Sequence, residues 1–573
     1  MKRKVISKKL FNFLLSSAIC VGTLATLTPQ TSYASTPDKN VCYELADNIQ
    51  DGVTLHCFNW TYKQIMDELP NISAAGFSSV QTSPAQTAVV GNSTWYYLYQ
   101  PNTFSVGNSG LGSEDDLKKL CSEADKYGIH VIVDVVANHL AGDHSNIDSS
   151  LKDSIYWHNY NGSIHYNNRY EITHGNIGMP DINSENSFVQ EKVRNYVQQL
   201  KADGVDGIRW DAAKHISLPS ESCGFWNSVI DNDLYNYGEI LDCPVTDNKS
   251  FANSLMSEYT DYMSVTDSVY SSNVLGSLNN GTVPTCFANW TTVNGIDNNE
   301  VVYWAESHDT FSNNTSEGGW TKYINQNTID RAYAIVASRN GASALYFSRP
   351  NQTNKDSIMV GQKGSTHFTS DEVAAVNHFH NACNGEPDYY TTDNNVAVIT
   401  RESGAVLVLG SGNNKYVSVK NGGGYTTPGT YVDEISGNIF TVTSDTISGT
   451  IGSTGIAVFY KLNDTPIDDD PTSDTNTIYF SNNNNWDNVY AYTWGGTTNT
   501  SSWPGDKMKY VKTNEFGEAI YKIEIASDVS GLIFNNGNGT KTVDISTGIY
   551  DGIGYYITNT NGICTVGTYK YSE

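Results

Sequence analysis

A carboxylate preceded two residues earlier by an arginine ends a short apolar segment, Gly207–Asp211. We expect this segment to be a β-strand that delivers Asp211 at its C-terminal end. Because strand side chains alternate in direction, Arg209 and Asp211 should lie on the same face. A neighbouring guanidinium favours the ionised carboxylate, which is the form that a carboxylate nucleophile needs. An isolated pair of this kind also fits a structural salt bridge, so catalysis must be argued from further motifs.

Three further motifs place polar side chains directly after apolar runs. They are Asp134–His139 (DVVANH), Gly238–Ile240 (GEI) and Glu306–Asp309 (ESHD). Parallel barrels carry their active sites at the carboxyl ends of the strands, where such residues gather. Each motif alone is weak evidence, but four in succession are difficult to explain as solvated loops. The sequence therefore predicts a cluster of carboxylates at one end of a barrel.

The elements that must position these motifs alternate between strands and helices. We expect strands at 53–58, 77–81, 130–135, 207–211, 237–240, 301–305 and 342–347, and helices at 62–69, 114–127 and 188–202. This alternation is typical of βα units and a parallel barrel. The polar stretch from about 140 to 180 is too long for an ordinary loop, so we expect an inserted subdomain there.

The rest of the chain has the pattern of β-domains. From residue 362 to 462, short alternating segments with Gly and Asn turns predict an antiparallel β-domain. Residues 463–477, with no apolar core, are expected to be a linker. Residues 478–573 are rich in Tyr, Trp, Asn and Gly and predict a further β-module.

Charge and the N-terminus indicate the environment of the protein. The 573-residue chain has a formal charge of −27, which argues against nucleic acid and anionic membranes as partners and leaves carboxylates for calcium. A basic start, an apolar run from Leu10 to Leu27 and the small-x-small pattern Ser32–Ala34 predict a signal peptide over residues 1–34. We therefore expect a secreted, extracellular protein with no membrane association after cleavage.

The cysteines leave two alternatives open. Nine occur, and Cys20 leaves with the signal peptide. The other eight are scattered without a C-x-x-C pair, which argues against a zinc site. They could form disulfides outside the cell or be buried free thiols.

Together, the four motifs resemble the signature regions of glycoside hydrolase family 13, and within it the secreted bacterial α-amylases. Trp95–Pro101 (WYYLYQP) and Met179–Asn183 (MPDIN) resemble further segments of that family. The resemblance covers about residues 45–460. It implies an α/β fold: a (β/α)8 barrel over 45–361 with domain B inserted at about 140–180, then an antiparallel β domain C over 362–462.

The resemblance assigns roles to the three carboxylates. Asp211 is the expected nucleophile, Glu239 the general acid/base and Asp309 the transition-state stabiliser. In the retaining mechanism one carboxylate attacks the anomeric carbon while the other protonates the leaving oxygen, with the pair ~5–5.5 Å apart. We expect nearby anions and burial to raise the pKa of Glu239, so that it is protonated at rest, while Arg209 keeps Asp211 charged.

The resemblance also implies contacts to sugar and to Ca²⁺. The expected substrate-binding residues are Tyr99, His139, Arg209, Lys214, His215 and His308. The expected calcium ligands are Asn138, Asp181, the main-chain oxygen of His215 and the carbonyl of Thr173. Oxygen donors with one carboxylate suit a hard cation. The alternatives are core histidines for His139 and His308, and simple capping of the domain B junction for the calcium set. Ser307 stands where chloride-binding members carry Asn, so chloride dependence is not expected.

An aromatic group marks the C-terminal module. Tyr490 and Tyr492 share one strand face by alternation, and Trp503 follows shortly after. Flat exposed rings are a natural platform for the apolar faces of glucose units. This spacing and the loop Asn535–Gly539 resemble starch-binding modules of carbohydrate-binding family 26, within a β-sandwich. The alternative is that these aromatics form the core of a small sandwich.

We therefore expect a secreted, monomeric, endo-acting α-amylase that hydrolyses α-1,4 bonds of starch and related glucans with retention. Its expected cofactor is Ca²⁺ and its partner is the glucan. The same fold could instead carry a transglycosylase, a maltogenic enzyme or a debranching enzyme. A non-catalytic glucan-binding protein and a calcium-dependent adhesin are the alternatives from other classes.

Overall fold

The structure is a computed structural model of the 573-residue chain. It describes residues 45–88, 94–108, 110–160, 162–240, 245–285, 295–341, 343–461, 475–496, 502–514, 517–545, 549, 552–559 and 564–571. The expected signal peptide and nearly all of the expected linker lie outside the described residues, as do Cys42, Cys243 and Cys286.

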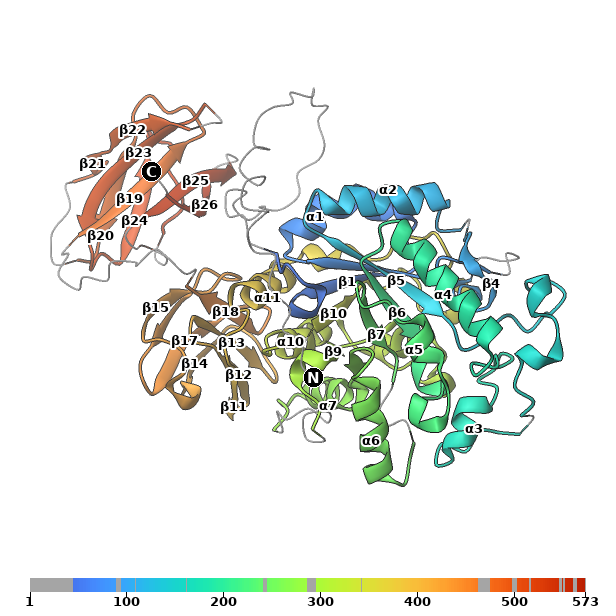
Figure 1. The fold of residues 1–573 in the computed structure, drawn as a ribbon. Coiled ribbons are helices and arrows are strands. Elements are labelled where there is room, and N and C mark those ends of the chain that lie inside the picture. Colours follow the sequence, from blue (N-terminus) through green and yellow to red (C-terminus); the bar gives the residue numbers. More distant parts are fainter. Residues whose placement is uncertain are drawn as a thin grey trace.

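Eight parallel strands form the barrel at the centre of the larger part of the molecule (Figure 1). They are β1 (Val53–Cys57), β2 (Ser79–Thr82), β5 (His130–Val136), β6 (Gly207–Asp211), β7 (Tyr235–Gly238), β8 (Val265–Thr266), β9 (Val301–Trp304) and β10 (Ser343–Phe347). The sheet order is β7-β6-β5-β2-β1-β10-β9-β8. Backbone hydrogen bonds between Gly238 and Ser264, and between Ser264 and Asn236, join the two edge strands and close the barrel. The predicted (β/α)8 barrel is confirmed.

Helices surround the barrel because each buries an apolar stripe against the strands. They are α1 (Tyr62–Ala74), α2 (Glu114–Asp125), α4 (Ser187–Ala202), α5 (Phe225–Val229), α6 (Lys249–Tyr259), α7 (Ser268–Asn279), α9 (His308–Ser312), α10 (Gln326–Ala337) and α11 (Asp371–Ala382). Ser113 is the N-cap of α2 and forms a capping box with Asp116. α1 runs past Pro70, where the sequence predicted its end, and thereby buries Ile72.

The expected insertion lies between β5 and α4. It contains the short helices η3 (Ser149–Leu151), η4 (Ser154–Tyr156) and α3 (Arg169–His174). Antiparallel bridges join its end to its beginning, between His139 and Asp181 and between Trp157 and Ile182. A second excursion, the hairpin of β3 (Gln86–Ala88) and β4 (Pro101–Val106), packs against α4.

Domain C begins later than the sequence suggested. Residues 371–382 form α11, which packs on α10 of the barrel and on the domain C strand 456–460, so the antiparallel strands start at Tyr389 and not at 362. Two four-stranded sheets follow, in the orders β11-β12-β13-β18 and β14-β17-β16-β15. Their strands are β11 (Tyr389–Asp393), β12 (Val396–Thr400), β13 (Gly404–Leu409), β14 (Lys415–Lys420), β15 (Gly429–Val432), β16 (Ile439–Val442), β17 (Thr446–Ile451) and β18 (Ile456–Tyr460).

The C-terminal module is a β-sandwich with its own core. A five-stranded sheet, β22-β23-β19-β25-β26, accompanies a three-stranded sheet, β21-β20-β24. The strands are β19 (Thr475–Asn482), β20 (Tyr490–Trp494), β21 (Asp506–Lys507), β22 (Lys509–Thr513), β23 (Ala519–Ala526), β24 (Gly531–Asn535), β25 (Ile553–Asn559) and β26 (Thr565–Lys570). Phe480, Trp486 and Phe534 stack in the core.

The described cysteines are free thiols. Cys57, Cys121, Cys223, Cys383 and Cys564 are all buried and none forms a disulfide. For these five, the second of the two sequence alternatives holds. None of the helices formed by the described residues combines the length and the apolar character needed to cross a membrane.

Candidate active site

The predicted carboxylates gather at the carboxyl ends of the barrel strands. Asp211 is the last residue of β6, and Glu239 directly follows β7. Asp309 is the second residue of α9, which starts shortly after β9 ends. Asp134 lies within β5 and is fully buried. The strand register of the barrel therefore brings together residues that are 175 positions apart in the chain.

A single guanidinium joins three of these carboxylates. Arg209 Nη1 lies 2.9 Å from Asp134 Oδ1 and 2.7 Å from Asp211 Oδ1, and its Nη2 lies 2.7 Å from Glu239 Oε2. Arg209 is only 5% exposed, so little solvent screens these charge-assisted hydrogen bonds. The expected contact between Arg209 and Asp211 is present, and the same cation also fixes Glu239.

The backbone after the strand supplies a second hydrogen bond to Glu239. Ala212 has a left-handed conformation, with φ of 49°. Its N–H donates to Glu239 Oε2 at 3.0 Å. A non-glycine residue in this region costs on the order of 1–3 kcal/mol, and such strain concentrates at functional sites. The turn after β6 therefore contributes directly to the geometry of the cluster.

The proton of the unliganded cluster is not where the sequence placed it. Burial raises the pKa of Glu239, but Arg209 and the N–H of Ala212 outweigh it, so the net pKa of Glu239 is lowered. Burial raises the pKa of Asp211 to about 7, although Arg209 opposes this shift. Partial burial and the charge of Glu239 raise the pKa of Asp309 to about 7 as well. The expectation of a protonated Glu239 beside a charged Asp211 is therefore wrong for the unliganded site.

Two predicted histidines and the predicted tyrosine surround the cluster. The Tyr99 ring stacks on the His308 ring at 5.2 Å, and its hydroxyl donates to Asp134 Oδ2 at 2.9 Å. His139 Nε2 lies 3.0 Å from the carbonyl oxygen of Tyr99. Burial and Arg209 lower the pKa of His308 to about 3, so this ring is neutral. A neutral imidazole can donate one hydrogen bond to a sugar hydroxyl.

The structure adds site residues that sequence reasoning missed. Those lining the pocket with Arg209, Glu239, His308 and Asp309 are His56, Gln81, Tyr237, Thr266, Ser307, Trp304 and Leu345. His56 is the clearest, because it lies near the end of the first strand and its ring meets that of His308 at 5.4 Å. The signal in the sequence that could have identified His56 was its position as a polar residue inside the apolar run 53–58.

Lys214 and His215 lie on the turn after β6. The Lys214 N–H donates to the Glu239 carbonyl at 3.3 Å, and its ammonium lies 5.3 Å from the centre of the Tyr166 ring. His215 is buried, and its Nδ1 donates to the carbonyl of Ile172 at 2.8 Å. Burial lowers the pKa of His215 to about 4. The turn therefore connects the cluster to α3 of the insertion.

The residues expected to hold Ca²⁺ are brought into one region. The Ile182 N–H donates to the carbonyl of Asn138, and Asp181 is bridged to the next residue, His139. Asn138 Nδ2 and Asp181 Oδ1 are buried and have no hydrogen-bond partner. Burial raises the pKa of Asp181 to about 7. A hard cation such as Ca²⁺ would bind a buried carboxylate oxygen that has no hydrogen-bond donor, so these residues fit the expected ion.

Thr173 and His215 complete that set from the other side. Thr173 is buried in α3, which contacts the turn carrying His215. The next residue, His174, packs its ring against His158, 4.2 Å away, and His158 is hydrogen bonded to Asp181. A continuous chain of contacts therefore links the four expected calcium ligands.

The aromatic residues of the C-terminal module form an exposed row. Along β20, Tyr490, Tyr492 and Trp494 share the partly exposed face. The Trp503 ring is 49% exposed and lies 5.5 Å from Tyr492. The buried core of the module is built from other aromatics. The ring of Trp494 lies 6.1 Å from that of Tyr492 and extends the row.

Two known families match parts of the chain. Residues 61–336 match the alpha amylase catalytic domain, and residues 478–547 match starch-binding module 26. An alpha-amylase of Clostridium acetobutylicum is 34% identical over 451 residues, which are 74% of this chain and 56% of the relative. One of Butyrivibrio fibrisolvens is 26% identical over 688 residues, covering 92% of this chain and 68% of the relative. The chain therefore spans little more than half of the Clostridium protein and about two thirds of the Butyrivibrio protein.

Solved structures share the fold. A mutant of alpha-amylase I from Eisenia fetida, in complex with maltohexaose, superposes with a TM-score of 0.60 at 18% identity, covering 73% of this chain and 99% of the other. A gamma-cyclodextrin glucanotransferase from alkalophilic Bacillus clarkii has a TM-score of 0.58 at 15% identity, covering 87% and 83%. The sequence matches confirm the resemblance to family 13: the chain carries an alpha-amylase catalytic domain, followed by a family 26 starch-binding module.

Proposed function

We propose that this protein is a secreted, endo-acting α-amylase that hydrolyses α-1,4-glucosidic bonds of starch with retention of anomeric configuration. The observation that carries the proposal is the shared guanidinium of Arg209, which holds Asp211 and Glu239 beside one another at the mouth of the barrel. Two carboxylates on one planar cation are compatible with the ~5–5.5 Å separation of retaining enzymes.

The proposed roles follow from position. Asp211 attacks the anomeric carbon, and Glu239 protonates the leaving oxygen and then activates water. Asp309, whose side chain is 39% exposed, faces the pocket and hydrogen bonds to ring hydroxyls as the sugar flattens. Tyr99, His139 and His308 bind the same sugar, while Lys214 and His215 line the leaving-group side.

The protonation pattern adds a step to this scheme. In the unliganded site, burial raises the pKa of Asp211 and of Asp309 to about 7, which favours a proton on one of these carboxylates over a proton on Glu239. Catalysis needs the proton on Glu239. We propose that substrate binding transfers the proton, because sugar hydroxyls that donate to Asp211 and Asp309 stabilise their ionised forms.

Calcium and starch attachment complete the proposal. Asn138, Asp181, Thr173 and His215 would hold Ca²⁺ where the insertion meets the barrel. The ion's contribution is to fix the insertion against the barrel, because its ligands come from both. Tyr490, Tyr492 and Trp503 would stack on glucose units of the polymer. We place the protein outside the cell on the strength of its N-terminal signal pattern, and we expect it to be a monomer.

The deciding experiment is the analysis of products from soluble starch. We expect the parent chain to release α-anomeric oligosaccharides of mixed length. Glu239→Gln should lose activity by about 10²- to 10⁴-fold, the usual contribution of general acid catalysis. The variant should still adsorb to starch. β-Anomeric products, or full activity in Glu239→Gln, would refute the proposal.

Substrate range separates the alternatives of the same fold. Cyclic or elongated products from amylose would indicate a transglycosylase, of which the gamma-cyclodextrin glucanotransferase of Bacillus clarkii is an example. Maltose as the sole product would indicate a maltogenic enzyme, and cleavage of α-1,6 bonds in pullulan a debranching enzyme. Starch adsorption without any hydrolysis would leave a non-catalytic glucan-binding protein.

A further inference from the structure

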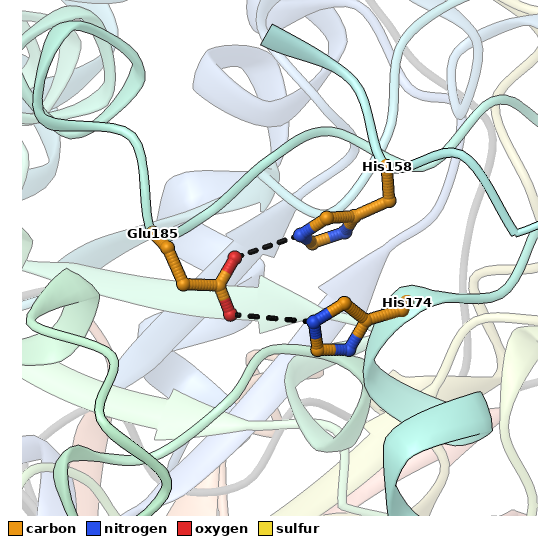
Figure 2. A group of neighbouring side chains, drawn as sticks. All are labelled: His158, His174 and Glu185. Atoms are coloured by element: carbon orange, nitrogen blue, oxygen red, sulfur yellow. Dashed lines mark hydrogen bonds and ion pairs between the residues drawn. The ribbon is translucent and has the colours of Figure 1, made fainter. Parts of the chain in front are cut away.

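Three side chains able to bind a metal ion converge in the insertion, away from the carboxylate cluster. Figure 2 shows the carboxylate of Glu185 beside the two imidazoles, with one oxygen directed at His158 and the other at His174. His158 Nε2 lies 2.7 Å from Glu185 Oε2, and His174 Nε2 lies 3.8 Å from Oε1. One ligand atom from each residue lies within 4.8 Å of the others.

Both imidazoles are oriented by acceptors at their other nitrogen. His158 Nδ1 lies 2.5 Å from Asp181 Oδ2, and His174 Nδ1 lies 3.1 Å from the carbonyl oxygen of Tyr170. When Nδ1 carries the proton and donates it to such an acceptor, Nε2 presents its lone pair. The two Nε2 atoms are the ones that face Glu185. Metal-binding histidines are held in this way, commonly by a carboxylate or a backbone carbonyl.

We propose that His158, His174 and Glu185 bind a divalent transition-metal ion, Zn²⁺ in particular, at a site separate from the expected calcium ligands. Two imidazole nitrogens and one carboxylate are a recognised zinc set, whereas Ca²⁺ takes oxygen ligands. Glu185 is 31% exposed and His174 is 20% exposed, so water can complete the coordination. The sequence argument against zinc considered cysteine ligands only.

The present geometry is close to a coordinated one. Ligand atoms on a tetrahedral zinc ion are ~3.3 Å apart, given bonds of about 2.0–2.1 Å. The 2.7 Å and 3.8 Å pairs use different oxygens of Glu185, so one oxygen has to turn toward both Nε2 atoms, and the ligand atoms, now within 4.8 Å of one another, have to reach this spacing. The proton that His158 Nε2 shares with Glu185 leaves to solvent as the ion binds, so that one positive partner replaces another.

A second cluster within the described residues does not have these features. In the group formed by Asp330, His367 and Glu372, only one ligand is an imidazole. His367 Nε2 lies 2.9 Å from Asp330 Oδ2, and the other oxygen of Asp330 accepts from Tyr346 and Gln326. This arrangement is a hydrogen-bonded ion pair whose acceptors are already satisfied.

The proposed ion would join segments that are separate in the sequence. His158 follows η4, His174 ends α3 and Glu185 immediately precedes the N-cap of α4. Asp181 links this group to the expected calcium site, because its Oδ2 pairs with His158 while its buried Oδ1 has no hydrogen-bond partner. Zinc should therefore stiffen the part of the insertion that carries Asp181 and Thr173, without touching the catalytic carboxylates.

The test is a calorimetric titration of the full chain with ZnCl₂ in excess CaCl₂. We expect one zinc ion per chain and a rise in Tm on binding. His174→Ala and Glu185→Gln should each weaken binding by more than the about 10- to 100-fold that changes to outer-shell partners cost. Co²⁺ in place of zinc should give the strong visible absorption of a tetrahedral site.

Two control variants make the result specific. His165→Ala removes a histidine of the same insertion that pairs with Glu171 and is 70% exposed, and His367→Ala removes the second cluster. Both should bind zinc like the parent chain. Cooperative unfolding and starch hydrolysis in calcium establish that each variant is folded. Absence of zinc binding by the parent chain, unchanged affinity in folded Glu185→Gln, or equal loss in either control would overturn the proposal.

Discussion

At the scale of single residues, the site places the positive charge of one arginine close to four carboxylates. Arg209 contacts Asp134, Asp211 and Glu239, and its charge also acts on Asp309. Like charges this close cannot all be ionised, so the group retains protons near neutral pH. Such protons belong to the cluster as a whole, and its apparent pKa values describe the group.

This arrangement predicts that kcat/KM falls as pH rises through about 7. The productive complex needs one proton within the pair formed by Asp211 and Glu239. The unliganded pair loses its last proton at the pKa of Asp211, about 7, and it gains a second proton only at the lowered pKa of Glu239. Activity should therefore be highest at mildly acidic pH, measured as kcat/KM on a soluble maltooligosaccharide.

Lys214→Met tests the electrostatic origin of the acid limb. The Lys214 charge contributes to lowering the pKa of Glu239, so its removal should raise that pKa and move the acid limb of the profile to higher pH. Asp143→Asn, an exposed change in the insertion, should leave the profile unaltered. An acid limb that stays in place in Lys214→Met, or a kcat/KM of the parent chain that still rises above about pH 8, well past the expected alkaline limb, would contradict this account.

Residue identities and protonation differ in how far the sequence reveals them. Strand-end position was enough to find Asp211, Glu239 and Asp309, because parallel strands bring their carboxyl ends together. The state of Glu239 depends on two donors, the Arg209 guanidinium and the N–H of Ala212. The N–H of Ala212 is directed at Glu239 because Ala212 has a left-handed conformation, and no pattern in the sequence predicted that conformation.

At the scale of elements, hydrophobic periodicity in the sequence located the long, apolar strands and helices. β6 was predicted to the residue, whereas β8 has two residues and leaves no pattern to detect. α1 continues past Pro70 because burial of Ile72 offsets the cost of proline, about 3 kcal/mol in a helix interior. The sequence placed residues 371–382 in domain C, because the packing of α11 against α10 can be seen only in the folded structure.

The insertion should depend on calcium for its stability. Asp181 Oδ1 is buried without a donor, so binding of Ca²⁺ removes an unfavourable group from the apo protein. At a calcium concentration roughly 100 times Kd, the stabilisation is about 2.7 kcal/mol. Calorimetry in zinc-free buffer should show a rise in Tm with CaCl₂ and its reversal by a chelator.

Asp181→Asn provides the matched test. It should abolish most of the calcium-dependent rise in Tm, whereas Asp143→Asn, an exposed change in the same insertion, should retain it. An equal response of the parent chain and Asp181→Asn to calcium would place the ion elsewhere. Both variants keep the side-chain volume, so the difference reports the carboxylate charge.

At the scale of the whole molecule, the proposed catalytic site and the proposed starch-binding surface lie on different domains. The carboxylate cluster lies in the barrel, and the aromatic row lies on a β-sandwich with a core of its own. Attachment should therefore be separable by mutation. Trp503→Ala should weaken adsorption to starch granules by about 3- to 10-fold, since an aromatic stacking contact contributes roughly 0.5–1.5 kcal/mol. The kcat/KM on a short soluble maltooligosaccharide should stay unchanged.

Tyr510 supplies the control for this last prediction. It is 58% exposed on β22, in the five-stranded sheet, whereas Trp503 packs beside β20 of the three-stranded sheet. Tyr510→Ala removes a comparable exposed ring outside the row and should leave adsorption intact. Equal losses in both variants would mean that general hydrophobic adhesion, and not the row of Tyr490, Tyr492 and Trp503, attaches the protein. Because the two variants remove exposed aromatic rings beside different sheets, the comparison assigns binding to one face of the module.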